Sequence, residues 1–267
     1  MILSSFYLTM SLCLLKLTTE EEKMKVLLIG GTGTISTAIT TMLARSGHEI
    51  YVLNRGNREN DLQRIRESTG GTIFSLISDK NDEDNTKKVI SSVLKKNDKF
   101  DVVADFIAFS VSDVERDYRV FTEKTNQYIF ISSASAYQKP LSNYLINEST
   151  LLSNPYWEYS RNKIACEEFL IEKYRKENFP ITIVRPSHTY DERSIPLGVH
   201  GKKGSWSVIK RMIEGKSVII HGDGTSLWTM THNTDFAKGF VGLMGNIHAI
   251  GERIQITSDE TLSWNQI

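Results

Sequence analysis

Tyr159 and Lys163 have the residue types and the spacing of a proton-transfer pair. Side chains at positions i and i+4 lie on one face of a helix. A free tyrosine has a pKa of about 10 and is a poor base at neutral pH, but a neighbouring ammonium group favours the phenolate and lowers that pKa. Ser133 follows an apolar run, and its hydroxyl can bind and orient the reacting oxygen. The three residues predict acid–base catalysis, with a surface Tyr–Lys pair on a helix as the alternative.

The stretch LLIGGTGTIS (27–36) links an apolar strand pattern to an amphipathic helix pattern. Its letters fit the frames G-x-G-x-x-S and G-x-x-G-x-x-S. Glycines permit a tight turn and a close approach to a pyrophosphate, and the helix N-terminus supplies amide donors. Ser36 replaces the usual last glycine and is small enough for the helix to pack on the strand. The loop predicts a dinucleotide site rather than only a structural turn, with contacts from Gly30, Gly33, Thr34 and Ile35.

The second apolar run ends in Asn54 and Arg55, where the adenosine ribose of a bound dinucleotide would lie. An acid at this place accepts a hydrogen bond from the 2′-hydroxyl of NAD, whereas an arginine can pair with the 2′-phosphate of NADP. Asn54 stands in the acid's place and Arg55 follows it, so the pair favours NADP over NAD. Arg55 as a solvated turn residue is the alternative.

Strand and helix patterns alternate along most of the chain, which predicts a parallel sheet covered on both faces. One predicted helix follows the glycine loop and closes at Gly47, and another begins at Pro155 and runs to about Lys176. The fold class is therefore α/β, with a Rossmann-type, doubly wound parallel sheet. The predicted strands are Lys25–Ile29, Glu49–Leu53, Thr72–Ile77, Asp101–Phe106, Gln127–Ser132 and Ile181–Val184.

Beyond Pro186 the alternation ends, and glycines, histidines and turns dominate up to Gly204. We expect a non-core N-terminal extension (1–23), a nucleotide-binding domain (24–186) and a small, partial substrate-binding region (187–267). A helix at about 235–244 would return from that region to the nucleotide-binding domain. Thr257–Glu260 is typical of a helix start, and we therefore expect a C-terminal part beyond Ile267. Two further elements are predicted, a helix at Trp206–Glu214 and a strand at Ser217–His221.

The composition disfavours several kinds of partner. The 267 residues include 32 basic and 32 acidic side chains, so the formal net charge is zero. This balance gives no electrostatic reason to expect nucleic acid or a membrane surface as a partner. Two cysteines make no disulfide framework, which favours a cytoplasmic location. The histidines show no metal-ligand spacing, and no metal is predicted.

The first residues, MILSSFYLTMSLCLLKL, are apolar but too short and too interrupted for a good membrane span. Three interpretations stay open. The true start is Met24, or the segment is an additional helix, or it is a membrane or export signal, although it lacks the positive n-region of a signal peptide.

Together these motifs resemble those of the extended short-chain dehydrogenase/reductases, specifically the NAD-dependent epimerase/dehydratase family that includes UDP-glucose 4-epimerase. The resemblance runs from about Met24 to the end and rests on GGTGTIS, DFIAF, SSASAY, YSRNK, VRPSHTY and HGDG followed by THNTDFA. It implies NAD or NADP as cofactor and hydride exchange with a sugar or nucleotide sugar, a small-molecule substrate. Tyr159 would move the proton, and Lys163 would also bind the cofactor ribose. It further implies a homodimer and cofactor contacts at Asp79, Phe106, Ile107, Ala108 and Pro186.

Two departures from the family pattern bear on the substrate. Dehydratases place an Asp-Glu pair directly after the catalytic hydroxyl residue, where this chain has Ala134 and Ser135, which cannot act as acid and base. A sugar 4,6-dehydratase is therefore disfavoured. Sugar-nucleotide epimerases carry an arginine for the diphosphate where this chain has Trp228, whose indole either stacks on a ring or packs in the core. The candidate substrate residues are Ser135, His188 and Trp228.

Two other functions stay open. The chloroplast stem-loop RNA-binding proteins resemble this group and also lack the diphosphate arginine, so a non-catalytic or RNA-binding member of the same fold is one alternative. Zero net charge disfavours it, and intact Ser133, Tyr159 and Lys163 favour an enzyme. The other alternative is a reductase of a small molecule without a nucleotide.

Overall fold

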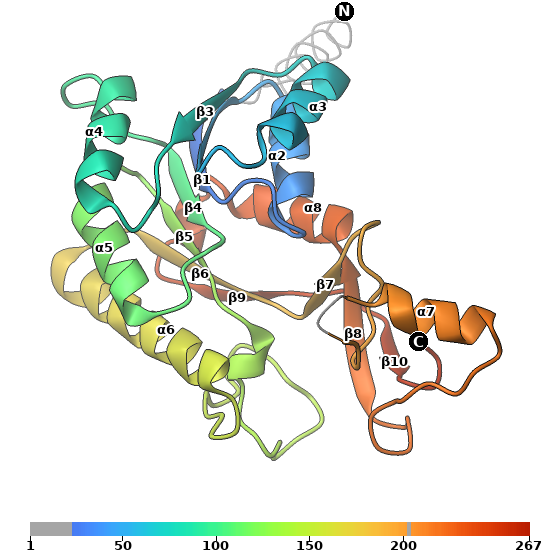
Figure 1. Cartoon of the computed structure of the whole chain (residues 1–267). Helices are drawn as coiled ribbons and strands as arrows, with labels where there is room; N and C mark the ends of the chain where they lie inside the picture. The colour runs from blue at the N-terminus through green and yellow to red at the C-terminus, as the bar shows by residue number, and fades with distance from the viewer. Residues whose placement is uncertain (1–22, 202–203) are drawn as a thin grey trace, which may run out of the picture.

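The computed structural model describes residues 23–201 and 204–267, so residues 1–22 of the predicted N-terminal extension lie outside it (Figure 1). Its centre is a seven-stranded sheet with the order β3-β2-β1-β4-β5-β6-β9. All neighbouring strands in it run parallel. The predicted α/β, doubly wound sheet is therefore confirmed. Its strands are β1 (Lys25–Ile29), β2 (Glu49–Asn54), β3 (Ile73–Ile77), β4 (Val102–Asp105), β5 (Tyr128–Ile131), β6 (Ile181–Pro186) and β9 (Arg253–Ile256).

Helices cover both faces of this sheet, as Figure 1 shows. One face packs against α2 (Ser36–Arg45), α3 (Glu59–Thr69) and α8 (Asn233–Leu243), and the other against α4 (Glu83–Val93), α5 (Val111–Phe121) and α6 (Glu158–Glu177). The strand β1 shows why its residues form a central strand. Val26 and Leu28 point into the first core and Leu27 and Ile29 into the second, because successive side chains of a strand alternate between faces.

A smaller, three-stranded sheet follows β6, with the order β10-β8-β7. It consists of β7 (His188–Tyr190), β8 (Leu227–His232) and β10 (Thr261–Ser263), and α7 (Trp206–Ile213) lies beside it (Figure 1). The chain then returns to the large sheet. The helix α8 buries Phe236, Ala237 and Phe240 in the core that α2 also lines, and β9 pairs with β6.

Three predicted elements differ from the structure: one helix begins later than predicted, and one strand and one helix are not formed. The helix expected from Pro155 begins at Glu158, because Asn154 Oδ1 accepts from Tyr156 N (3.1 Å) and holds the chain in a turn. Ser217–His221 forms no strand among the described residues, and Ile219 there is 76% exposed. Its apolar pattern gave a strand signal, but no neighbouring strand pairs with it.

The helix expected to start at Thr257–Glu260 is also absent. Ser258 Oγ donates to Met230 O (2.5 Å), and Ser258 N donates to Thr231 Oγ1 (3.0 Å). These bonds tie the segment to β8 instead of capping a helix, and the following residues form β10, antiparallel to β8. The division of the chain at Pro186 stays a prediction.

Candidate active site

The glycine loop lies directly on the large sheet. Gly30 has a φ of +83°, and a Cβ there would be 2.7 Å from Cγ2 of Ile107 in the loop after β4. A Cβ on Gly31 would lie 3.1 Å from Cγ1 of Val52 in β2. The backbone thus approaches its neighbours more closely than a side chain would permit.

Ser36 closes the glycine loop. Its buried Oγ donates to Gly30 O (2.6 Å) and accepts from Gly33 N (2.8 Å). A glycine at this position could make neither bond, so Ser36 adds two hydrogen bonds that hold the loop closed. The helix α2 then begins at an N-cap, Ile35, that makes no side-chain capping bond. Thr37 N donates to Gly33 O (3.0 Å), so the turn of the loop itself binds one of the first N–H groups, and no side chain competes with a ligand for the others.

The end of β2 carries two arginines beside this loop. Asn54 Oδ1 accepts from Gly56 N (2.6 Å), so the asparagine holds the turn, and Arg55 is exposed. Arg58, which the sequence analysis did not single out, donates from Nη1 to Thr32 O (3.0 Å). Its guanidinium therefore contacts the glycine loop. The run RGNR (55–58) was the available signal for it.

The loop after β4 is held by charged side chains. The buried carboxylate of Asp105 accepts from Ile107 N (2.5 Å), and Lys80 Nζ donates to Ile107 O. Asp113 accepts from Phe109 N (2.9 Å). Sequence reasoning missed these three anchors, because their partners lie far along the chain or on backbone atoms.

A second buried carboxyl supports Asp105 from α5. Burial and the neighbouring Asp105 raise the pKa of Asp117 well above its ordinary value, and Tyr128 Oη donates to Asp117 Oδ2 (2.6 Å). Asp105 Oδ2 is buried and has no donor among the described residues. The raised pKa favours the neutral form of Asp117, because two adjacent carboxylates cannot both ionise at low cost.

Lys163 is buried beneath the predicted catalytic residues. Its Nζ donates to Ala108 O (2.7 Å) and to Ile131 O (2.6 Å). An ammonium group has three N–H donors, so one is left for another acceptor. Burial lowers the pKa of Lys163 to about 8. The ammonium also lies over three aromatic rings, those of Phe109, Phe130 and Tyr159.

Tyr159 and Ser133 are brought together, as predicted. Burial raises the pKa of the Tyr159 phenol, and a hydrogen bond with Ser133 acts in the opposite direction. The sequence predicts a phenol pKa lowered by Lys163, whereas in this structure the phenol pKa is raised. The physical reason is that burial dominates while the lysine ammonium is bound to two backbone carbonyls.

The three candidate substrate residues do not form one group. Ser135 lies with Ser133, their hydroxyl oxygens being 2.9 Å apart. His188, whose pKa is lowered mainly by burial, and Trp228 lie on the small sheet. Trp228 is 40% exposed and its ring centroid is 5.7 Å from that of Trp264, so the alternative of a core tryptophan is wrong.

The remaining predicted cofactor residues lie at the ends of their strands. Asp79 is exposed after β3, where its Oδ1 accepts from Asn81 N (2.9 Å). Phe106 packs its ring against Phe240 of α8, at 5.5 Å between centroids. Ala108 and Pro186 are buried, so their contribution to a ligand site would come from their backbone and neighbours.

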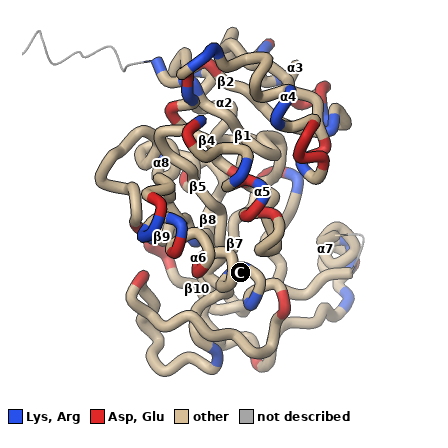
Figure 2. The backbone as a smooth tube through the Cα atoms, turned by 90° about the vertical axis from the view of Figure 1, so that its left-hand side faces the viewer, with Lys and Arg blue, Asp and Glu red and all other residues tan. Residues whose placement is uncertain are grey.

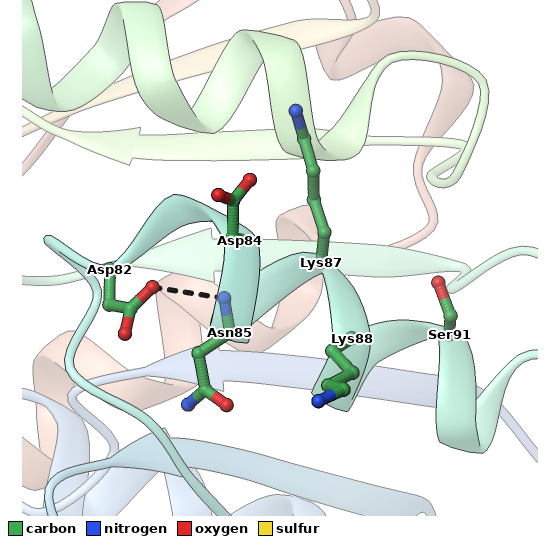
Figure 3. Close-up of a pocket in the computed structure, with 6 residues that line it drawn as sticks. All are labelled: Asp82, Asp84, Asn85, Lys87, Lys88 and Ser91. Carbon is green, nitrogen blue, oxygen red and sulfur yellow. Dashed lines mark hydrogen bonds between the residues drawn. The ribbon is translucent and has the colours of Figure 1, made fainter.

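A hollow on α4 lies outside this group, and Figure 3 shows its lining. Asp82 caps the helix by accepting from Asn85 N (3.0 Å), and Lys87 pairs with Glu83 (2.7 Å). These contacts are local to one helix. The lining is polar and lacks the apolar walls usual in ligand sites. It consists of Asp82, Asp84, Asn85, Lys87, Lys88 and Ser91.

The model of the NAD dependent epimerase/dehydratase family matches residues 26–256. The chain belongs to this family. It is 21% identical to 2'-dehydrokanamycin reductase of Streptomyces kanamyceticus, over 93% of the chain and 66% of that protein. It is 26% identical to the chloroplast stem-loop binding protein of 41 kDa b of Arabidopsis thaliana, over 92% of the chain and 61% of that protein. The chain thus spans less than two thirds of the length of either relative.

A solved structure with the same fold is that of the UDP-glucuronic acid 4-epimerase from Bacillus cereus, in complex with UDP-glucuronic acid and NAD. Its TM-score with the present structure is 0.68 at 22% identity, and the superposition covers 91% of the chain described here and 80% of the epimerase. Within the part of the chain that the structure describes, no group of three or more His, Cys, Asp or Glu side chains could hold a metal ion. No helix in that part is long and apolar enough to cross a membrane.

Proposed function

We propose that this protein is an NAD(P)-dependent epimerase or reductase that moves a hydride between a nicotinamide cofactor and a sugar or nucleotide-sugar carbon. The observation that carries the proposal is the Ser133–Tyr159 pair beside the buried Lys163 ammonium. The strand order reverses between β1 and β4, and open α/β sheets bind ligands at such a point, at the carboxyl ends of the strands. The glycine loop and the loop after β4 both lie there.

The residues present fit a dinucleotide. A Cβ at Gly30 would collide with Ile107, and the following helix has no side-chain cap. A close backbone and free amide donors are what a pyrophosphate requires. Asn233 donates to Thr34 O (3.0 Å), and its buried Oδ1 has no donor among the described residues. This unsatisfied acceptor suits a ligand donor such as a hydroxyl group, and not the pyrophosphate, whose oxygens only accept.

We favour NADP over NAD. Arg55 is exposed at the end of β2, and Arg58 contacts the glycine loop. Arg58 thus places a guanidinium group beside the glycine loop, Arg55 follows Asn54 at the end of β2, and Asn54 itself is occupied by the turn. Arginine pairs with phosphate through two parallel hydrogen bonds.

In the proposed reaction, the Tyr159 phenolate takes the proton of a substrate hydroxyl, and the phenol returns it in the reverse direction. The single Ser133 O–H donates toward the Tyr159 oxygen in the free protein and would donate to the substrate oxygen once the substrate is bound. Lys163 keeps one N–H for the phenol oxygen or for a ribose hydroxyl. The bound nicotinamide would supply the site that accepts or gives the hydride. Ala134 and Ser135 provide no acid–base pair, so elimination of water is not part of the proposal.

The substrate class is tested with purified protein supplied with NAD+ or NADP+ and a panel of UDP- and dTDP-sugars. Nicotinamide absorbance detects net oxidation, and NMR of the sugars detects epimers formed without net oxidation. We expect one nucleotide sugar to react. Failure of UDP and dTDP to bind at all would contradict the nucleotide part and favour a free sugar or another small ketone.

RNA binding is a second candidate, favoured by the similarity to the chloroplast stem-loop binding protein. Lys, Arg, Asp and Glu are mixed along the chain in Figure 2, with both signs close together near α4 and α5. Tight RNA binding usually uses clustered positive charge. Submicromolar, salt-sensitive binding of a stem-loop RNA at low salt would replace the enzyme proposal.

A further inference from the structure

Four polar side chains form a connected chain that ends at the candidate catalytic tyrosine. Asn154 Nδ2 donates to Ser160 Oγ (3.3 Å), and Ser160 Oγ donates to Ser135 Oγ (2.9 Å). Ser135 Oγ lies 2.9 Å from Ser133 Oγ, and the neighbouring Ser133 side chain lowers the pKa of the Tyr159 phenol. Ser160 is fully buried and Asn154 nearly so, which keeps competing water away from the chain.

The direction of these bonds follows from counting donors. The orientation of the Asn154 amide is fixed, because its Oδ1 accepts from Tyr156 N and its Nδ2 donates to Ser135 O (2.8 Å). The chain therefore begins with an N–H donor. Each hydroxyl has a single proton. Because Ser135 Oγ accepts the proton of the Ser160 hydroxyl, the Ser135 hydroxyl donates its own proton to Ser133 Oγ.

Ser133 is then left with one role. Its Oγ accepts from Ser135 N (3.1 Å) as well as from the Ser135 hydroxyl. Both lone pairs of that oxygen are occupied, so its own O–H can only donate outward. The Tyr159 phenol is the group whose pKa Ser133 lowers, as expected of a hydroxyl that donates toward it, because a donor stabilises the phenolate more than the phenol.

We propose that Asn154, Ser160 and Ser135 are positioning residues, which form a one-way hydrogen-bond chain that orients the Ser133 hydroxyl as a donor toward Tyr159. Ser135 thereby has a different role from the substrate contact predicted from the sequence. Ser160 and Asn154 carry no catalytic motif of their own, and only the fold brings them to Ser135. The inference rests on the proposed function solely for the role of the phenol.

The test replaces Tyr159 with 3-fluorotyrosine in the full chain and follows its 19F resonance against pH. Fluorine makes the phenol more acidic, which brings the titration into a range where the protein stays folded. Ser133→Ala should raise the phenol pKa by roughly 1 unit and Ser135→Ala by roughly 0.5 unit, the size of one lost hydrogen bond. Ser160→Ala should raise it by less. Ser135→Thr, which keeps the hydroxyl, should leave it unchanged.

The decisive comparison is a double-mutant cycle. Ser135→Ala should have no further effect on the phenol pKa when Ser133 is already alanine, because its influence passes through that hydroxyl. Ser142→Ala removes an exposed hydroxyl outside the chain and serves as the control, with no shift expected. An unchanged phenol pKa in Ser135→Ala, or an equal shift with and without Ser133, would overturn the inference. The titration uses neither cofactor nor substrate, so its outcome is separate from that of the turnover assays.

Discussion

Gly30→Ala is expected to destabilise the protein through the contact of the glycine loop with Ile107. An alanine at a φ of +83° adopts a left-handed conformation, which costs about 1–2 kcal/mol. Its Cβ would also lie 2.7 Å from Ile107 Cγ2, about 1 Å closer than carbon atoms normally pack. Relieving such overpacking costs about 1–3 kcal/mol. The free energy of unfolding should therefore fall by roughly 2–5 kcal/mol.

Urea unfolding followed by circular dichroism measures this change directly. Gly70→Ala is the matched control, because Gly70 also has a positive φ, +67°, but a Cβ there would meet nothing within 4 Å. The control should lose only the conformational cost, about 1–2 kcal/mol. In the Gly30→Ala background, Ile107→Ala should cost less than it does alone, since it also removes the clash. Equal losses for Gly30→Ala and Gly70→Ala would refute the close approach of the glycine loop to Ile107.

Three further outcomes are expected. Arg55→Ala and Arg58→Ala should each weaken NADP binding more than NAD binding in fluorescence titrations, and equal effects on both would remove the argument for NADP. The raised pKa of Asp117 means that the folded state binds a proton that the unfolded state loses above a pH of about 4. The stability contributed by this group therefore falls as the pH rises toward the folded-state pKa. Asp117→Asn should remove that decline in urea unfolding at pH 5 to 8, and an unchanged slope would contradict the raised pKa of Asp117. The buried Arg185 guanidinium lies 2.5 Å from Glu167 Oε2, and Glu167→Gln removes this counter-ion. The substitution should lower the free energy of unfolding by about 3–5 kcal/mol. A loss below about 1 kcal/mol, the range of exposed ion pairs, would contradict a stabilising buried pair.

The large sheet could be predicted because its strands are buried on both faces. Uninterrupted apolar runs such as Lys25–Ile29 have few other structures available to them, and β1 has the predicted bounds. The small sheet could not be predicted in the same way. Ser217–His221 and β8 are both short and apolar enough for a strand, and only the pairing of β8 with β7 and β10 decides between them.

In the candidate site, too, features with a local sequence signal could be predicted, and features that depend on contacts between distant segments could not. Tyr159, Lys163 and Ser133 could be predicted because their types and local spacing carry the signal. The raised pKa of Asp117 beside Asp105, and the chain that ends at Ser133, depend on contacts between distant segments, for which the sequence has no periodic pattern. The prediction that Lys163 lowers the pKa of Tyr159 is wrong for a related reason. The two backbone carbonyls that bind the Lys163 ammonium belong to a loop and a strand far from Lys163 in the sequence.

The acid–base role of Tyr159 is tested by comparing hydride transfer with cofactor binding in the wild-type protein and in Tyr159→Phe. The substitution removes one hydroxyl and keeps the ring that contacts Lys163. We predict that the rate of hydride transfer to or from the reactive sugar falls by at least about a hundredfold, the usual contribution of a general acid–base group, while the cofactor Kd stays nearly unchanged. Hydride transfer at the wild-type rate in Tyr159→Phe would show that Tyr159 is not the group that transfers the proton.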